Sequence, residues 1–385
     1  MTKKYYDEDA YRTSFEATVL SCEGIKEGYA VTLDGTLFFP EEGGQTADTG
    51  TLGAANVTDV RIKNDIIYHI TDAPLTVGES VKGEINFAPR YHKMQNHTGE
   101  HIVSGIVHML YGYQNVGFHL GSEDVTLDFD GELSRAELDR VEELANEVIY
   151  RNVKVSARYP AAEELKSLTY RSKLDLSENV RIVTIEGTDN CACCAPHVRR
   201  TGEVGLIKLL DFVRYKGGIR IHMQCGHAAL LDYRTKYEQA AKCSALMSVK
   251  QGEIAEGVAA LLKANEELAF SIKELKKQTA RRIAKCITPF APISFFIEQG
   301  FDADVWREAA SSLSEAYDGI FAFFFQKSDT LYGYTLCSRN EDLKPLCSSI
   351  NQSLNGKGGG KGSMAQGSVS ATGTEIQMFF ENYSN

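Results

Sequence analysis

Two pairs of potential metal ligands, far apart in the chain, constrain this sequence more than any other feature. In the segment NHTGEHIVSG, His97 and His101 are four residues apart, and in CACCAPHV the same interval separates Cys193 from His197. On a helix, residues at this interval project from one face, so the two imidazoles can bind one ion. Three nitrogens and one thiolate suit Zn²⁺ far better than Mg²⁺ or Ca²⁺. We therefore expect the first segment to begin a helix and the second to form a loop that presents its ligands to that helix.

Two further cysteines leave the identity of the thiol ligand open. Cys191 and Cys194 lie beside Cys193, and either is an alternative ligand or a redox partner. The chain contains nine cysteines, an odd number with uneven spacing. This pattern indicates reduced thiols with some metal ligands rather than a disulfide framework.

Composition and charge exclude several classes of protein. A length of 385 residues with 43% hydrophobic residues is that of an ordinary globular protein of several domains. The net charge of −11 argues against non-specific coating of nucleic acid, which depends on clustered Lys and Arg. No apolar run approaches the roughly 18 residues of a membrane span, and the N-terminus is polar without a signal-like segment. We expect a cytoplasmic protein that does not enter a membrane.

The periodicity of apolar residues predicts a multidomain α+β protein in four parts. Residues 1–90 are expected to form a small β-barrel domain, 91–235 an α/β zinc-binding domain, 236–285 a helical linker and 286–385 a C-terminal α/β domain. Short alternating runs predict the strands of the first part at residues 15–20, 28–33, 36–39, 57–62, 66–70 and 80–85. Between them lies FFPEEGGQTADTGTL, in which Gly43 and Gly44 allow close approach of a backbone and Gln45 offers a neutral donor and acceptor. A plain hairpin loop is the alternative.

The second part alternates helices and strands. Apolar residues at the helical period predict a helix over residues 97–110, and FHLGSEDVTLDFDG is expected to be a strand. An amphipathic helix is predicted from Ser134 to Asn152, with Ser134 as N-cap and Glu137 three residues later. A strand over residues 180–185 leads into the cysteine-rich loop. Two more strands are expected around a Lys216-Gly217-Gly218 turn.

The third part is a long helical pattern with heptad spacing. Its core positions are Ile254, Val258, Leu261, Asn265, Leu268, Ile272 and Leu275. This predicts a coiled coil or helical hairpin, and hence a homodimer formed through the linker. The basic residues at its end are either a solvated face or a tRNA-contacting stripe; they are Lys273, Lys276, Lys277, Arg281, Arg282 and Lys285. The fourth part has strands at residues 320–326 and 330–337 and ends in a glycine loop, NGKGGGKGSMAQGS.

Four ordered motifs between residues 36 and 226 carry a family resemblance. FFPEEGGQTADTGTL, HTGEH, CCAPHVRRTGEVGLIKLL and KGGIRIHMQCG together resemble the editing domain of alanyl-tRNA synthetase and its free-standing relatives, the AlaX trans-editing proteins. In that family the corresponding residues hold zinc, which implies His97, His101, Cys193 and His197 here. The family more often has glycines where this chain has Cys194 and Ala195. The last hundred residues resemble the terminal domain of the same proteins, associated with oligomerisation and tRNA binding, which implies Lys357 and Lys361 as RNA contacts.

The resemblance implies a zinc-dependent hydrolase that deacylates tRNA(Ala) mischarged with Ser first and Gly second. No segment resembles the aminoacylation domain with its ATP site, so editing in trans is expected. Gln45 and Thr98 are the polar groups expected near the amino acid, and Glu100 completes the candidate catalytic set. Two alternatives stay open. HTGEH satisfies the His-x-x-Glu-His pattern of a metallopeptidase with Glu100 as general base, and a closed structural zinc would suit a non-catalytic tRNA-binding protein.

Overall fold

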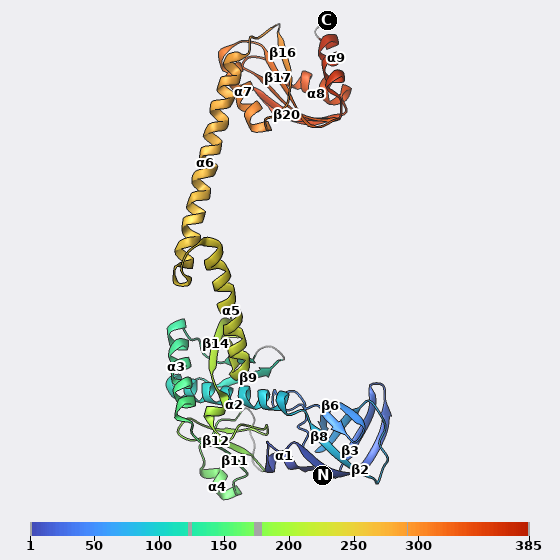
Figure 1. Cartoon of the computed structure of the whole chain (residues 1–385), viewed down its shortest axis with the longest axis vertical. Coiled ribbons are helices and arrows are strands. Elements are labelled where there is room, and N and C mark those ends of the chain that lie inside the picture. The colour runs from blue at the N-terminus through green and yellow to red at the C-terminus, as the bar shows by residue number, and fades with distance from the viewer. Residues whose placement is uncertain (1, 122–124, 173–178, 291, 384–385) are drawn as a thin grey trace. The chain divides into compact units, whose positions relative to one another are not determined.

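A computed structural model describes the chain except for residues 1, 122–124, 173–178, 291 and 384–385 (Figure 1). The chain divides into two compact units, residues 1–240 and 241–385. Helices and sheets are mixed in both, which confirms the predicted α+β class. The expected boundary between residues 90 and 91 falls inside helix α2 (Phe87–Tyr111), so the first two expected domains share one unit. In the part of the chain that is described, no helix is long and apolar enough to cross a membrane.

Six strands near the N-terminus close into a barrel. Its order is β2-β3-β7-β6-β5-β8, with bounds Ser14–Ile25, Gly28–Leu33, Ile66–Thr71, Ala55–Lys63, Gly50–Leu52 and Ser80–Ile85. Alternate side chains such as Phe15, Val31 and Val60 fill its interior, as the period of two requires. Short β1 (Lys3–Lys4) and α1 (Tyr5–Glu8) precede the barrel, and β1 pairs with β4 (Gly35–Thr36).

The strand predicted over residues 36–39 is wrong beyond Thr36, where β4 ends. Leu37 to Phe39 are fully buried, but side chains satisfy their backbone groups instead of a neighbouring strand. Phe39 N–H donates to Asp48 Oδ2 over 2.7 Å, and Leu37 O accepts from Arg90 Nη2 over 2.7 Å. The loop from Pro40 to Asp48 is thereby tied at its base to α2, because Arg90 belongs to that helix.

Helix α2 begins ten residues before His97, so the expectation that the motif starts the helix is wrong. Pro89 lies in the first turn, where its missing N–H is not needed. The helix ends at Gly112, which adopts φ +74°. His97 and His101 therefore lie in the middle of a 25-residue helix whose central residues, from Asn96 to Val107, are all buried. A mid-helix position gives both rings a rigid backbone.

A four-stranded sheet and helix α3 complete the core around α2. The sheet order is β14-β15-β10-β9, with bounds Ile207–Tyr215, Gly218–Cys225, Val125–Phe129 and Asn115–Leu120. The single strand predicted for FHLGSEDVTLDFDG is instead two, and residues 122–124 of that prediction lie outside the described residues. The predicted Lys216-Gly217 turn is confirmed, with φ of 49° and 83°, values that suit a two-residue hairpin.

Helix α3 (Arg135–Arg151) confirms the strongest local prediction. The Ser134 hydroxyl accepts from Glu137 N–H while the Glu137 carboxylate accepts from Ser134 N–H, a complete capping box. Asn152 closes the helix with φ +50°. Beyond it, β11 (Val155–Arg158), β12 (Ile182–Ile185) and β13 (Asp189–Ala192) form a three-stranded sheet, and α4 (Ala162–Ser167) lies between β11 and β12 in the chain.

The long helical pattern after the sheet consists of two helices rather than one. Helix α5 (Gly226–Met247) ends where Ser248 adopts φ +56°, and a short 3₁₀ turn (Gln251–Glu253) precedes α6 (Ile254–Cys286). The Ser244 hydroxyl donates to Val249 O, which satisfies a carbonyl at the break. In the second unit, the heptad residues Val258, Leu261, Leu268, Ile272 and Leu275 are each 44–62% exposed.

The second unit is a three-layer sandwich. Its sheet order is β16-β17-β18-β20-β19, with bounds Ile293–Glu298, Ile320–Ser328, Leu331–Ser338, Met364–Val369 and Gly356–Lys361. Alternate residues of β17 face opposite layers: Phe321 and Phe323 pack with α7 (Ala303–Ala316) and the end of α6, and Phe324 packs with α8 (Lys344–Ser353) and α9 (Gly373–Tyr383). The two strands predicted around residue 328 are confirmed.

The predicted glycine loop is wrong, because GKGGGK forms the edge strand β19. Glycine is poor in strands by propensity, but here close packing decides. A Cβ on Gly358 would lie 2.0 Å from the Tyr334 hydroxyl, and one on Gly360 would lie 2.0 Å from Met364 O. The glycines therefore let the edge strand approach its neighbours, and Lys357 and Lys361 stay exposed.

Candidate metal centre

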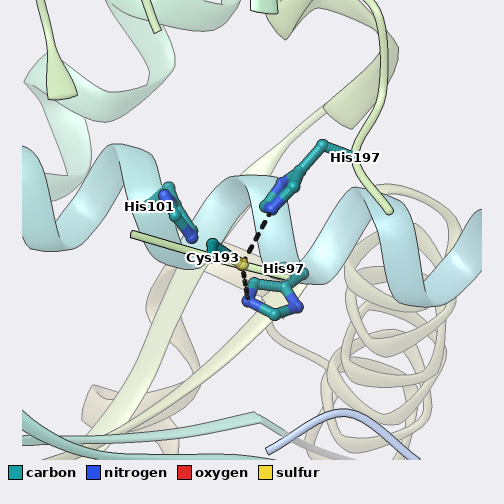
Figure 2. A group of neighbouring side chains, drawn as sticks. All are labelled: His97, His101, Cys193 and His197. Carbon is teal, nitrogen blue, oxygen red and sulfur yellow. Dashed lines mark hydrogen bonds between the residues drawn. The ribbon is translucent and has the colours of Figure 1, made fainter. Parts of the chain in front are cut away.

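Helix α2 and the loop after β13 bring the four predicted ligands together. His97 and His101 project from α2, and Cys193 and His197 come from the loop (Figure 2). The Cys193 Sγ lies 3.5 Å from His97 Nε2 and 3.4 Å from His197 Nε2. Each residue offers a ligand atom within 4.8 Å of the others, and the three histidines are buried. These four atoms form a group that could hold one metal ion.

Close packing fixes α2 against the elements around it. A Cβ on Gly99 would lie 2.4 Å from Cys225 Sγ of β15, and one on Gly105 would lie 2.6 Å from Thr188 O. These glycines flank His101 in the chain and let the helix lie directly on the sheet and on the β12–β13 turn. The helix can therefore shift little relative to the loop that carries Cys193.

Arg181 positions the loop that carries the thiol. Its Nη1 donates to Cys193 O over 3.0 Å and to Ala195 O over 2.8 Å, and its own carbonyl accepts from Cys193 N–H over 3.0 Å. The guanidinium is 7% exposed and pairs with Asp7. An arginine and an N-terminal aspartate thus hold the backbone on both sides of Cys194.

Each histidine has a separate partner for its Nδ1 atom. His97 Nδ1 lies 3.0 Å from Gln45 Oε1, His197 Nδ1 lies 3.0 Å from Thr98 Oγ1, and His101 Nδ1 lies 3.2 Å from Asp189 Oδ2. Amide and carboxylate oxygens accept, so Nδ1–H of His97 and of His101 donates and leaves the Nε2 lone pair for an ion, whereas the Thr98 hydroxyl beside His197 can donate or accept. The Nε2 atoms of His97 and His197 are the ones that face Cys193 (Figure 2).

The electrostatics of the cluster suit a metal ion. Burial raises the pKa of the Cys193 thiol well above its ordinary value. Burial, followed by the neighbouring His101 and His97 rings, lowers the pKa of His197 well below its ordinary value. Neutral imidazoles are ready donors, and a cation would stabilise the thiolate that burial disfavours. The residues present therefore fit Zn²⁺ in their chemistry and in the nature of their donors.

The candidate catalytic residues all lie at this cluster. Gln45 and Thr98, which are expected near the amino acid, contact His97 and His197. Gln45 Nε2 is buried and has no hydrogen-bond partner among the described residues. Glu100 Oε2 lies 3.6 Å from His101 Nε2, and its Oε1 accepts from Ser104 and Asn115, each over 2.6 Å.

The two other cysteines of the loop face elsewhere. Cys194 packs with the barrel core, and burial followed by Glu42 raises the pKa of its thiol to about 12. Cys191 groups with His101 and Asp189 rather than with the other histidines. Among the three, Cys193 is the cysteine grouped with all three histidines.

Sequence spacing missed three residues that build the cluster: Asp189, Arg171 and Arg181. Asp189 lies between the strand predicted over residues 180–185 and the ligand Cys193, and Arg181 directly precedes the buried strand β12. A charged residue next to a ligand loop is a weak signal for such a role. Although burial alone would raise the pKa of Asp189, hydrogen bonds from Arg171 and His101 lower it below its ordinary value.

The predicted RNA contacts are divided between free and paired cations. Lys276 pairs with Asp302, and Lys277 pairs with Glu274 over 3.0 Å. Lys273, Arg281 and Arg282 are exposed on α6. The last turns of this helix pack on α7 through Ala280 and Ala284, so its basic residues flank a buried contact.

Two segments of the chain match known protein families. Residues 180–222, which include Cys193 and His197, match the family described as threonyl and alanyl tRNA synthetase second additional domain. Residues 290–382, nearly all of the sandwich, match the DHHA1 domain.

Individual relatives share more of the chain. Alanyl-tRNA editing protein AlaX-L from Pyrococcus horikoshii is 27% identical over 395 residues, covering 98% of this chain and 96% of that protein. Alanine–tRNA ligase from Natronomonas pharaonis is 33% identical over 296 residues, and the match covers 72% of this chain but 32% of that protein. The C-Ala domain of Aquifex aeolicus alanyl-tRNA synthetase aligns at 18% identity and a TM-score of 0.22, covering 24% of this chain and 91% of that domain. The resemblance of this chain to AlaX-type proteins is confirmed.

Proposed function

We propose that the protein is a trans-editing deacylase that hydrolyses mischarged tRNA(Ala), Ser-tRNA(Ala) first and Gly-tRNA(Ala) second, with zinc bound by His97, His101, Cys193 and His197. The observation that carries this proposal is the buried cluster of three imidazoles and one thiol, in a chain that matches an AlaX-L protein over nearly its whole length. The chain spans about a third of the length of the alanine–tRNA ligase with which it shares 33% identity.

The reaction is hydrolysis of an ester. A water oxygen attacks the carbonyl carbon of the aminoacyl group, the bond to the ribose oxygen breaks, and the free amino acid and the tRNA hydroxyl are released. Zinc supplies Lewis acidity to such a site when it is bound. The chain must supply a proton acceptor for the water and donors for the substrate oxygens.

Glu100 is the proposed acceptor of this proton. Its Oε1 is held by two hydrogen bonds, so its Oε2 is fixed beside the ligand atom of His101. Gln45 Nε2 has no partner in the described part of the chain, while its Oε1 contacts His97, so Nε2 is the proposed donor to the substrate. A buried donor without a partner favours a substrate that hydrogen-bonds to it, which is how a seryl hydroxyl is distinguished from an alanyl methyl group.

The tRNA is proposed to contact cations of the second unit. Lys273, Arg281 and Arg282 on α6 and Lys357 and Lys361 on β19 are exposed and suit phosphate contacts. The exposed heptad face of α6 supports a homodimer formed through the helical linker and C-terminal domain. The cytoplasmic location stays a prediction.

The test is deacylation of Ser-tRNA(Ala), Gly-tRNA(Ala) and Ala-tRNA(Ala) by the purified chain, with zinc content measured in parallel. Cys193→Ala removes the thiol ligand, and Cys243→Ala removes an exposed cysteine of α5 as a matched control. We expect loss of the seryl ester, a spared alanyl ester, and loss of both activity and zinc in Cys193→Ala alone. Intact esters with full zinc would refute the deacylase and leave a tRNA-binding protein with structural zinc.

A peptide substrate separates the deacylase from the metallopeptidase alternative. Glu100→Gln does not, because Glu100 is the proposed proton acceptor in the deacylase and the general base in a peptidase of the His-x-x-Glu-His type. Cys193 and His197 group with both histidines, so the loop supplies ligands that the peptidase pattern does not require. A casein-type peptide substrate should therefore stay uncleaved by the parent protein.

A further inference from the structure

The partner of His101 differs from those of the other two histidines because it carries a charge. Asp189 opens β13 directly after the β12–β13 turn, and its side chain is 2% exposed. Its Oδ2 lies 3.2 Å from His101 Nδ1. Gln45 and Thr98, by contrast, offer neutral oxygens to His97 and His197.

Arg171 fixes the carboxylate from the other side. Its Nε donates to Asp189 Oδ1 over 2.8 Å and its Nη2 donates to Oδ2 over 2.7 Å, a bidentate pair. The backbone of Arg171 is bound on both sides to β13, since its N–H donates to Asn190 O and its carbonyl accepts from Ala192 N–H. The guanidinium is 11% exposed. The position of the carboxylate is therefore set by two elements of the fold and does not depend on His101.

The helix is shaped to receive this carboxylate. Gly105 lies one turn after His101, and a Cβ there would lie 2.6 Å from Thr188 O and 2.9 Å from Asp189 Cβ. The turn reaches the His101 ring because this position has no side chain.

Asp189 could instead be a ligand, because His101, Asp189 and Cys191 also form a group able to hold an ion. The bidentate guanidinium argues against that role. It already neutralises both carboxylate oxygens, and a second cation at the same oxygens would lie against a fixed positive charge. The remaining role of the carboxylate at the metal centre is to accept a hydrogen bond from His101 Nδ1–H.

We propose that Asp189, held by Arg171, is a positioning residue that orients His101 so that its Nε2 faces the metal ion. This inference rests on the proposed zinc centre. A carboxylate behind a ligating imidazole fixes its tautomer and ring orientation and raises its basicity, and loss of such a partner typically weakens metal binding about 10- to 100-fold.

The experiment measures zinc affinity of the full chain by competition with a chelator, together with zinc per chain and the visible spectrum after loading with Co²⁺. Asp189→Ala removes the acceptor, and Asp189→Asn keeps an acceptor oxygen without the charge. Asp128→Asn is the matched control, because Arg220 binds Asp128 in the same bidentate manner, over 2.6 and 2.7 Å, on the sheet strand β10.

We expect one zinc per chain in every variant, with binding at least about tenfold weaker in Asp189→Ala, less weak in Asp189→Asn, and unchanged in Asp128→Asn. The Co²⁺ spectrum should change in Asp189→Ala alone, since it reports ligand geometry. Unchanged affinity and spectrum in Asp189→Ala would overturn the inference. It would also be overturned if the parent binds two zinc ions and Asp189→Ala loses one of them, because Asp189 would then be a ligand. A parent that binds no zinc would instead overturn the zinc centre of the proposed function.

Discussion

Arg90 and Asp48 form a fully buried ion pair that joins the barrel loop to α2. Arg90 is 0% exposed and Asp48 is 1% exposed. The guanidinium also donates to Leu37 O over 2.7 Å and to Ala10 O over 3.2 Å. Arg90→Met keeps much of the volume but removes all of these donors. It leaves the buried Asp48 carboxylate with its hydrogen bond from Phe39 N–H but no cation, and it removes the arginine donors of the Leu37 and Ala10 carbonyl groups.

The expected cost is large because the remaining charge stays buried. Removing one partner of a buried pair destabilises by about 3–5 kcal/mol. Since each 1.4 kcal/mol is a factor of ten, the opening equilibrium of the first unit should rise by roughly two to three and a half powers of ten. Asp48 is also the end of the loop that carries Gln45, so the contact with His97 should loosen and zinc affinity should fall.

Hydrogen exchange measured by mass spectrometry is the suitable assay, because it reports on separate segments. Peptides of β2, β3 and α2 should lose protection in Arg90→Met. The chain's only tryptophan, Trp306, is buried in the second unit, so its fluorescence transition in urea should not move and serves as an internal control. Arg135→Met, which breaks the exposed pair with Asp139, is the matched variant. Equal effects of the two substitutions would refute the reasoning.

Three further predictions follow from other parts of the chain. Burial lowers the pKa of His69 to about 4, below its unfolded value near 6.5. Between these pH values the unfolded state binds more protons than the folded state, so the free energy of unfolding of the barrel should fall by about 2 kcal/mol from pH 7.5 to pH 5. In urea unfolding measured at several pH values by hydrogen exchange, His69→Gln should abolish this pH dependence, whereas His119→Gln, at an exposed histidine, should keep it. A parent protein whose barrel stability does not change with pH would contradict the role of His69. Gly105→Ala should lower the free energy of unfolding by about 1–3 kcal/mol through overpacking, and it should weaken zinc binding. Gly252→Ala is the control, because a Cβ there meets nothing within 4 Å, and it should change neither quantity. Equal zinc affinity in the two variants would count against the tight contact at Gly105. The double variant Lys357→Ala and Lys361→Ala should reduce the slope of log affinity for tRNA against log salt concentration by about one unit per lost phosphate contact. Lys166→Ala on α4 is the control and should leave the slope unchanged. An unaltered slope in the double variant would show that β19 is not part of the tRNA interface.

Local signals in the sequence predicted the elements that local chemistry determines. The capping box of Ser134 and Glu137 gave the start of α3, the apolar period gave its end to within a residue, and the Lys216-Gly217 turn gave its hairpin. The two ligand pairs were found by spacing alone and lie together in the fold. Such features depend on groups a few residues apart, which a single sequence displays directly.

The errors arose where distant contacts decide. Phe39 leaves the strand because the Asp48 carboxylate replaces a neighbouring strand. The glycines of β19 form an edge strand despite their low strand propensity, because Tyr334 and Met364 come so close that a side chain would not fit. Asp189 and Arg171 were missed for the same reason, since nothing in local spacing connects either residue to His101.

An ion shared by α2 and the cysteine loop would also act as a cross-link. From His97 to Cys193 the chain runs 193 − 97 = 96 residues, and both residues contribute to the same cluster. Closing a loop of about 100 residues removes roughly 4–5 kcal/mol of conformational entropy from the unfolded chain in the simplest polymer treatment. Zinc would then close residues 97–193, which include β9, β10, α3 and the strands β11 to β13, into one covalent-like ring. Removal of zinc by a chelator should make this whole segment sensitive to proteases at once. Cleavage in α3 and in the three-stranded sheet should then appear in the same step as cleavage near the ligands.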